Sequence, residues 1–169
     1  GNLWLGTWGG GLNQMALSRP GVFTRYQPDP YLPHSLSSDS VWSLLQDQSG
    51  VLWVGTANNG LNKLTPHSRH FALFQNQPDD PASLGHNAVG AFAIDPGGAL
   101  WVGTWGGGLD RFDPASGAFR HYRHDPTDPL SLSNDLVMAL HLDAHGDLWI
   151  GTLGSGLDRL RAGTMGTAA

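Results

Sequence analysis

The chain has 169 residues, of which 14% are charged, and its formal net charge is −5 at pH 7. Its nine Lys and Arg residues are not clustered, which argues against a nucleic-acid partner because such a partner needs a positive stripe. The absence of cysteine excludes disulfides and thiol chemistry. No apolar run approaches the length of a membrane-spanning helix.

One unit is repeated along the chain. Four tryptophans occupy the same phrase, Leu-Trp-x-Gly-Thr with Leu, Val or Ile at x: Trp4, Trp53, Trp101 and Trp149. They lie 49, 48 and 48 residues apart, and a Gly-Leu pair follows each of them at a constant distance. A period of this length is typical of the blades of β-propellers.

The turn signals within a unit predict four short strands. The first strand ends in Asp-x-x-Gly, a turn signature, in each of the three units that contain it, at residues 40–47, 88–95 and 136–143. The Leu-Trp-x-Gly-Thr phrase is too short for a helix and is predicted as the second strand. In the third unit, a third strand at 108–112 and a fourth at 118–123 flank a turn that contains Pro and Gly.

The side-chain pattern indicates stacked blades. Leu100, Trp101 and Val102 point to alternate faces of their strand, yet all three are apolar, so both faces should be covered. Gly103 would let the backbone of a neighbouring blade approach closely. A β-sandwich would instead show one polar face along most strands and no long-range register. We therefore predict an all-β fold, a β-propeller of four-stranded antiparallel blades with a repeat of about 48 residues.

The predicted blades form an incomplete arc of a larger ring. The chain starts inside the second strand of one unit and stops after the third strand of another, which makes fourteen strands. The partial propeller spans 1–161 and a flexible tail 162–169, with blades at 1–30, 31–79, 80–127 and 128–161, of which the first and last have three strands each. The remaining blades of a parent propeller, or a second copy of the chain, would complete the ring.

Three phrases of the chain resemble the two-component regulator propeller repeats. They are Ser-Leu-Ser-Asn-Asp at 131–135, the segment from Asp143 to Thr152, and Gly-Leu-Asp-Arg-Phe-Asp-Pro at 108–114. The resemblance covers nearly the whole chain, from Leu3 to Leu160. It implies a periplasmic or extracytoplasmic input domain of a bacterial hybrid histidine kinase or related signalling protein, which recognises a small molecule, in several relatives a carbohydrate.

A ligand is expected on one face of the propeller. Because the strands alternate in direction, the long connections between units (27–39, 75–87 and 123–135) emerge together with the loops between second and third strands; we call this the loop face. The opposite turn face carries the repeated Asp-x-x-Gly turns. The loops vary where the scaffold does not, with Trp8, Ala57, Trp105 and Leu153 at one position, and binding specificity resides in such variation.

Aromatic and polar residues on the loop face are the candidate site. Trp8 and Trp105 could each offer an aromatic plate to a sugar ring, with hydrogen bonds from Asn58, Asn59 and Ser155. The alternative for both tryptophans is that they cap the gap between blades.

Three further candidates lie at or just before a first strand. Trp42 could line the central channel or pack within the structure. His86 and Asn134, which share a position just before a first strand, could add hydrogen bonds or cap a turn.

The sequence favours a sensor over an enzyme. The eight histidines form no metal signature, and Gly154-Ser155-Gly156 is a variant of the glycine-rich loop rather than a nucleophile motif, so no catalytic residue, metal or cofactor is expected. A protein-interaction scaffold is the alternative, and a propeller lyase or hydrolase a weaker one, on fold analogy alone. The expected partners are a small-molecule ligand, such as an oligosaccharide, and the blades that complete the ring.

Overall fold

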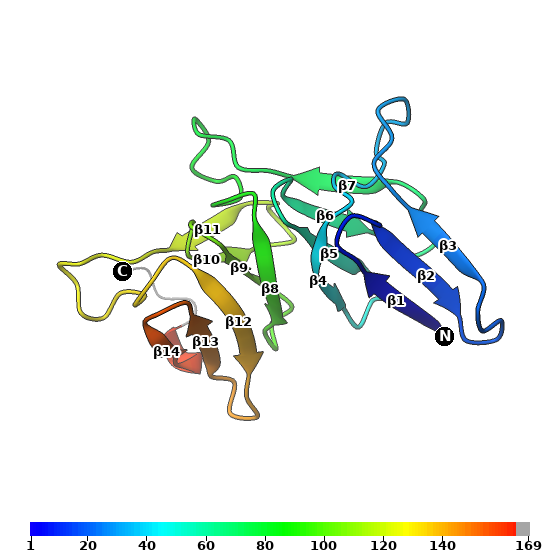
Figure 1. The fold of residues 1–169 in the computed structure, drawn as a ribbon. Helices are drawn as coiled ribbons and strands as arrows, with labels where there is room; N and C mark the ends of the chain where they lie inside the picture. Colours follow the sequence, from blue (N-terminus) through cyan, green and yellow to red (C-terminus); the bar gives the residue numbers. More distant parts are fainter. Residues whose placement is uncertain (165–169) are drawn as a thin grey trace. The chain divides into compact units, whose positions relative to one another are not determined.

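The computed structural model describes residues 1–164, which form fourteen β-strands in four antiparallel sheets (Figure 1). Strand order follows chain order in every sheet. The first sheet contains β1 (Asn2–Gly6), β2 (Leu12–Ala16) and β3 (Phe23–Tyr26), and the second contains β4 (Val41–Gln46), β5 (Leu52–Thr56), β6 (Leu61–Leu64) and β7 (Phe71–Phe74). The third contains β8 (Val89–Ile94), β9 (Leu100–Thr104), β10 (Leu109–Phe112) and β11 (Phe119–Tyr122), and the fourth contains β12 (Val137–Leu142), β13 (Leu148–Thr152) and β14 (Gly156–Leu160). The predicted all-β fold of antiparallel, blade-like sheets is confirmed.

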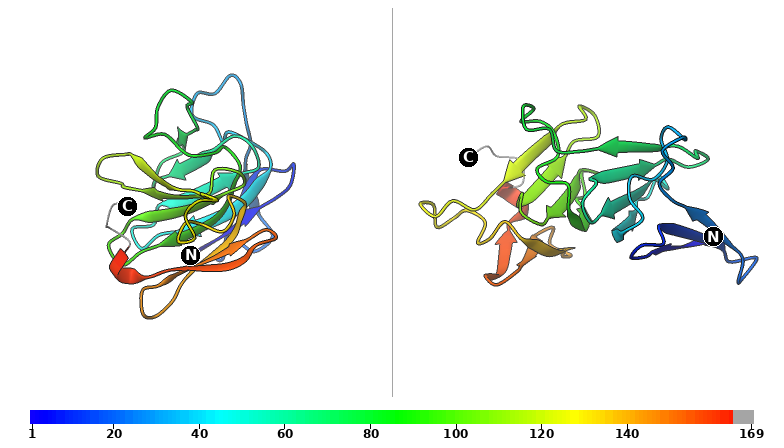
Figure 2. Two further views of the ribbon diagram at one scale, coloured as in Figure 1. Left: turned by 90° about the vertical axis from the view of Figure 1, so that its left-hand side faces the viewer. Right: turned by 45° about the horizontal axis from the view of Figure 1, so that its top comes forward.

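The chain divides into two compact units. Unit 1 comprises Gly1–Gln75 and Asn87–Val89, with the first and second sheets; unit 2 comprises Asn76–His86 and Gly90–Ala169, with the third and fourth. Figure 2 shows the twist of the sheets from two further directions. The tail expected at 162–169 opens with a 3-10 turn, η1 (Ala162–Thr164), and its residues 165–169 lie outside the described residues. No helix in the described part is long and apolar enough to span a membrane.

The Asp-x-x-Gly phrase forms the turn between the first two strands of a sheet. In the second sheet, Asp47 Oδ1 accepts the backbone N–H groups of Ser49 and Val51 at 2.9 and 3.0 Å. Gly50 closes the turn with its N–H on the Asp47 carbonyl and has φ of 85°, a conformation that glycine adopts without strain. Asp143 and Gly146 repeat this arrangement in the fourth sheet. The repeated aspartate therefore satisfies the turn backbone, which is the structural role that its recurrence favours.

The strands that carry Trp53 and Trp101 are covered on both faces. Every residue of β5 and β9 is buried, and Trp101 has no exposed surface. In unit 1 the core consists of Leu12, Leu36, Val41, Leu52, Val54, Leu64 and Phe71. In unit 2 it consists of Ala93, Trp101, Leu109, Leu132, Val137, Leu148 and Ile150. Each core joins side chains of two sheets, so the adjacent sheet of the same unit covers one face of β5 and of β9.

Gly103 permits this close packing within unit 2. A Cβ atom at Gly103 would lie 2.6 Å from Cγ1 of Val137, which belongs to the adjacent sheet. The corresponding Gly151 in β13 has more room, because the nearest atom to a Cβ there is the Ala139 Cβ at 3.5 Å. The two glycines have the same sequence context and differ in the space around them.

Substitution of these glycines tests the packing argument. Gly103→Ala is expected to lower the free energy of unfolding by about 1–3 kcal/mol, since a methyl group must displace Val137. Gly151→Ala is the matched control and should change it by less than about 1 kcal/mol. Urea unfolding followed by tryptophan fluorescence measures both. Equal effects of the two substitutions would contradict the argument.

Candidate functional site

The loop that carries Trp8 is fixed by backbone hydrogen bonds inside unit 1. The N–H groups of Gly9 and Gly11 both donate to the Asp39 carbonyl, at 3.1 and 2.7 Å. The Thr7 carbonyl accepts the N–H of Val41 at 2.9 Å, and the Thr7 hydroxyl donates to the Gly11 carbonyl at 2.8 Å. The loop between β1 and β2 is thereby held against the segment that leads into β4.

Trp8 and Trp42 form a stacked aromatic pair on this fixed loop. Their ring centroids lie 5.8 Å apart with an interplanar angle of 27°. Trp42, at the start of β4, is half-buried, whereas Trp8 is 79% exposed. The structure therefore brings together two of the predicted site residues and presents one of them to solvent.

The predicted amide groups of unit 1 have different surroundings. Asn59 joins its loop to the segment before β4, because its side chain donates to the Ser37 carbonyl at 2.6 Å and the Ser37 hydroxyl donates to the Asn59 carbonyl at 3.0 Å. Asn58 is exposed, and its side chain makes no hydrogen bond within residues 1–164. Of the two predicted residues, Asn58 is the one with a side-chain amide available to a ligand.

Unit 2 contains the other predicted residues. Trp105 is half-buried, with its indole over β8: a Cβ atom at Gly90 would lie 2.8 Å from Nε1. Its backbone forms a β-bridge with Leu136. His86 is exposed, and its Cβ lies 2.8 Å from the position of a Cβ at Gly107. Trp105 thus packs on its own sheet, in contrast to the exposed Trp8.

Asn134 acts as a turn cap. Its Oδ1 accepts the N–H of Leu136 at 2.8 Å, and its Nδ2 donates to the hydroxyl of Ser155 at 3.4 Å. Ser38, at the corresponding position in unit 1, accepts the N–H of Ser40 at 3.2 Å in the same way. Asn134 and Ser38 therefore each cap a turn, which for Asn134 is the alternative to ligand binding. Ser155 is exposed and lies beside Asn134.

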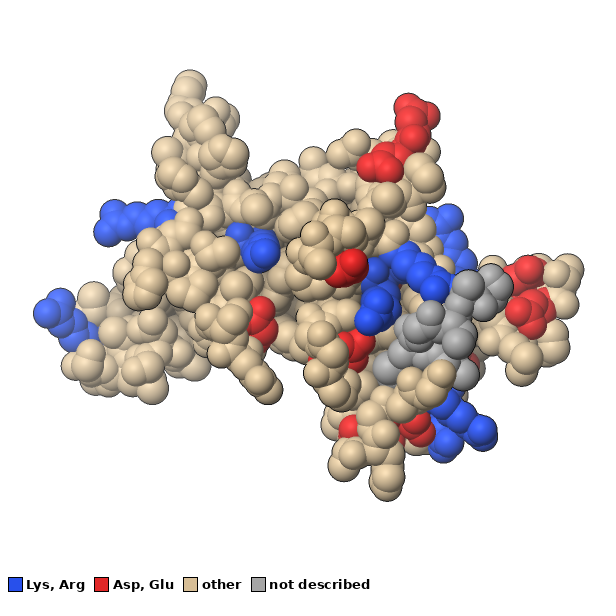
Figure 3. Space-filling view, turned by 180° about the vertical axis from the view of Figure 1, so that it is seen from behind, with Lys and Arg blue, Asp and Glu red and all other residues tan. Residues whose placement is uncertain are grey.

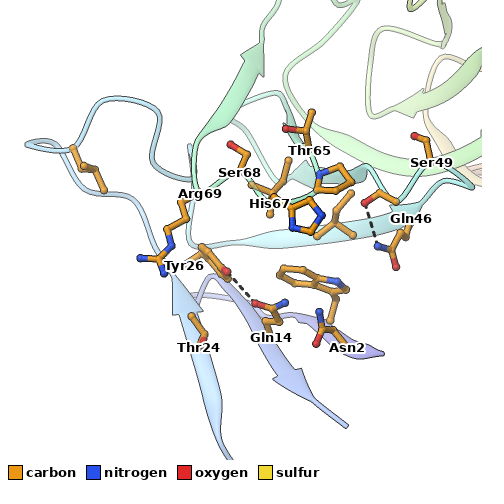
Figure 4. A pocket seen from close by; sticks show the side chains of 16 residues that line it. Asn2, Gln14, Thr24, Tyr26, Gln46, Ser49, Thr65, His67, Ser68 and Arg69 are labelled. Atoms are coloured by element: carbon orange, nitrogen blue, oxygen red, sulfur yellow. Dashed lines mark hydrogen bonds between the residues drawn. The ribbon is translucent and has the colours of Figure 1, made fainter. Parts of the chain in front are cut away.

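A groove on the turn face of unit 1 was missed by sequence reasoning (Figure 4). It has a volume of about 860 Å³ and lies between the first and second sheets. Its walls include Trp4, Gln14 and Tyr26 from the first sheet, together with the turns at 49–50 and 65–69 from the second.

One substitution within the repeat marks this groove. In the other three sheets a cation lies over the repeated tryptophan, with Lys63 5.2 Å from the Trp53 ring centroid, Arg111 5.7 Å from Trp101 and Arg159 5.5 Å from Trp149. Gln14 occupies this position in the first sheet, where its Oε1 accepts the hydroxyl of Tyr26 at 3.0 Å. The replacement of a cation by glutamine in one of the four repeats is visible in the sequence and could have identified the groove.

A histidine and a buried aspartate form an ion pair in unit 2 that sequence reasoning also missed. His121 Nδ1 lies 2.6 Å from Oδ1 of Asp110, which has no exposed surface, and Nε2 lies 2.9 Å from the Pro81 carbonyl oxygen. Asp110 Oδ2 accepts the N–H of Gly85 at 2.7 Å. The hydrogen bond to Asp110 raises the pKa of His121, against burial and the charge of Arg123, which lower it.

The His121–Asp110 pair stabilises the fold and is not arranged for proton transfer to a substrate. Both partners of the imidazole are acceptors, so both ring nitrogens of His121 donate when the ring is protonated. A general base needs a ring nitrogen within reach of substrate, and neither is available in this arrangement.

The described part of the chain shows no metal centre. Residues 1–164 contain no group of three or more His, Asp or Glu side chains placed to hold a metal ion. Figure 3 shows that uncharged residues make up most of the face drawn.

Within each unit, adjacent four- and three-stranded antiparallel sheets with a shared core define part of a β-propeller. The family model of the two-component regulator propeller matches residues 35–58, 83–106 and 131–154. Three segments of the chain therefore match the repeat of that family, in agreement with the resemblance seen in the sequence. No curated protein sequence matches the chain.

Solved propellers resemble the chain over nearly its whole length. The extracellular domain of a hybrid two-component system, BT3049 from B. thetaiotaomicron, is 28% identical with a TM-score of 0.82 and covers 96% of this chain. The extracellular domain of BT4673 from the same organism is 21% identical with a TM-score of 0.51 and covers 94%. Virginiamycin B lyase from Staphylococcus aureus is 17% identical with a TM-score of 0.65 and covers 95%. This chain spans 22%, 25% and 52% of those three chains, respectively, and the last two likenesses concern the fold alone.

The His121–Asp110 pair predicts a pH-dependent stability. Because the pKa of His121 is raised on folding, the pair adds stability that is fully present below the pKa of an unfolded histidine, about 6.5, and is lost as the pH rises through the higher folded value. His121→Gln can still donate to Asp110 but does not titrate. The urea midpoint of the unaltered chain should therefore fall between about pH 6 and pH 9 more than that of the variant.

The control for this experiment is His141→Gln, which replaces an exposed histidine of β12 in the same unit. This variant should keep the pH dependence of the unaltered chain. Parallel pH profiles of the unaltered chain and His121→Gln would contradict the assignment.

Proposed function

We propose that the chain is part of the sensor domain of a bacterial signalling protein of the two-component type. The domain lies outside the cytoplasm, in the periplasm or beyond it, and recognises a small molecule such as a carbohydrate on the loop face. The likeness to the extracellular domain of BT3049 over 96% of this chain supports the signalling role and the location. The three family repeats point in the same direction.

The exposed Trp8 on a rigid loop is the observation that carries ligand binding. An indole that is 79% exposed contributes little to the core, yet it is held by a stacked neighbour and by two glycine N–H groups on one carbonyl. A sugar ring offers apolar C–H groups to such a surface and hydroxyl groups to neighbouring amides such as Asn58. Because the loop is already ordered, a ligand would meet a small entropic cost on binding.

The proposed domain is non-catalytic. The resemblance to virginiamycin B lyase is 17% in identity and extends to the fold alone. The closest contact between a histidine and a carboxylate, at His121 and Asp110, leaves no ring nitrogen for substrate. Other blades of a parent propeller, or a second copy of this chain, would supply the rest of the ring.

A tryptophan substitution tests the proposed ligand surface. In thermal-shift and calorimetric titrations with a panel of oligosaccharides, at least one should bind, and Trp8→Ala should weaken that binding by about tenfold or more, since the stacking surface is lost. Trp8→Phe should keep part of the affinity. Val22→Ala, at an exposed apolar residue in the turn after β2, is the control and should bind like the unaltered chain.

Two results would contradict the proposal. One is an unchanged affinity in Trp8→Ala. The other is the absence of binding by any sugar together with Trp8-dependent capture of a protein partner, which would indicate the alternative role of an interaction scaffold.

A further inference from the structure

The groove of unit 1 has the dimensions of a ligand site and lies away from the proposed sugar surface. Its volume of about 860 Å³ falls within the range of roughly 300–1,000 Å³ that is usual for small-molecule sites. It is lined by the Asp-x-x-Gly turn after β4 and by the turn after β6, which belong to the turn face, and by Leu32 of the connection 27–39. Trp8 and Trp42 do not line it.

The groove has an aromatic wall. Trp4 and Tyr26 line it with their rings in contact, at 5.8 Å between centroids and an interplanar angle of 40°. Gln14 accepts a hydrogen bond from the Tyr26 hydroxyl, so the glutamine side chain lies toward the tyrosine. In the other three sheets the residue at this position is a cation that lies over the tryptophan. Trp4 lines the groove and is half-buried, as is Trp149 beneath Arg159, whereas Trp53 and Trp101 are 3% and 0% exposed. The indole of Trp4 is therefore open to a ligand ring.

The rest of the wall is polar and contains no carboxylate. Side-chain amides of Asn2, Gln14 and Gln46 line the groove together with hydroxyl groups, which Figure 4 shows around it. Neither Asp nor Glu is among the lining residues, although the chain as a whole carries a net charge of −5. Amides and hydroxyls beside an aromatic ring suit a ligand with several hydroxyl groups.

Basic side chains lie at one wall of the groove. Arg69 stands next to Tyr26 in Figure 4 and makes no ion pair with any residue between 1 and 164. The His67 ring points toward the groove from a backbone with φ of 65°, a conformation that non-glycine residues seldom adopt. An unpaired guanidinium without nearby carboxylates favours an anionic group, for which arginine offers two parallel N–H donors.

We propose that this groove binds a sugar acid, with a pyranose ring against Trp4 and its carboxylate at Arg69. The site does not include Trp8 or Trp42, takes a ligand of different charge and does not depend on the carbohydrate function proposed for the loop face. Its volume accommodates an acidic disaccharide, so digalacturonate is a suitable probe and galactobiose is its neutral counterpart.

The experiment is a titration of the 169-residue chain followed by NMR. The seven indole N–H signals report on each tryptophan separately, and Trp4→Phe and Trp8→Phe identify the two that matter. Digalacturonate should shift the Trp4 signal and leave the Trp8 signal in place. Galactobiose should bind this groove about tenfold more weakly or not at all, since a hydrogen-bonded charge pair is lost.

Arginine variants test the charge pair. Arg69→Gln should weaken digalacturonate binding by about tenfold, whereas Arg19→Gln, an exposed arginine of unit 1 outside the groove, should leave it unchanged. Equal binding of the two disaccharides, or equal effects of the two substitutions, would overturn the proposed carboxylate contact. A shift of the Trp8 signal without one at Trp4 would overturn the site, while leaving the proposal for the loop face intact.

Discussion

A single backbone hydrogen bond recurs at the contact between consecutive repeats, and the other contacts depend on it. The N–H groups of Gly11, Gly60 and Gly108 donate to the carbonyls of Asp39, Asn87 and Asp135, at 2.7, 2.8 and 3.0 Å. Each bond joins a loop after Gly-Thr to the segment that leads into the next first strand, within one unit. Only glycine fits, because φ is 75–84° and a Cβ would collide with the carbonyl of Tyr26, Phe74 or Tyr122.

This constraint explains how a fixed scaffold presents variable side chains. Once the loop is held at its glycine, the residue after Gly-Thr projects from a defined position, and its neighbours decide its environment. Trp8 stacks on Trp42 and stays exposed, whereas Trp105 lies over Gly90 and packs on its own sheet. Trp42 lies on the first strand of the sheet that follows Trp8, whereas Gly90 lies on the first strand of the sheet that carries Trp105, so the two indoles contact different sheets.

The groove of unit 1 follows from the same principle on the turn face. A repeated tryptophan covered by Lys or Arg is part of the scaffold, as in the pairs of Trp53 with Lys63 and Trp101 with Arg111. When Gln14 takes that position, the cation is lost and the glutamine bonds to Tyr26 instead. Repeat proteins can thus create a site by omitting one interaction of the repeat, because the remaining contacts still hold the sheets in place.

The sequence by itself determined the repeat, the strands, the turns and the loop positions that vary, because those features depend on local geometry: an aspartate that caps its own turn and a glycine with positive φ. It also named Trp8 as a candidate, and this residue is 79% exposed in the structure. Only the tertiary structure decided that Trp8 stacks on Trp42, that Trp105 is half-buried, that Asp110 pairs with His121 and that a groove adjoins Trp4. Those outcomes depend on which side chains of a neighbouring strand or sheet fill the same space, and no spacing along one repeat contains that information.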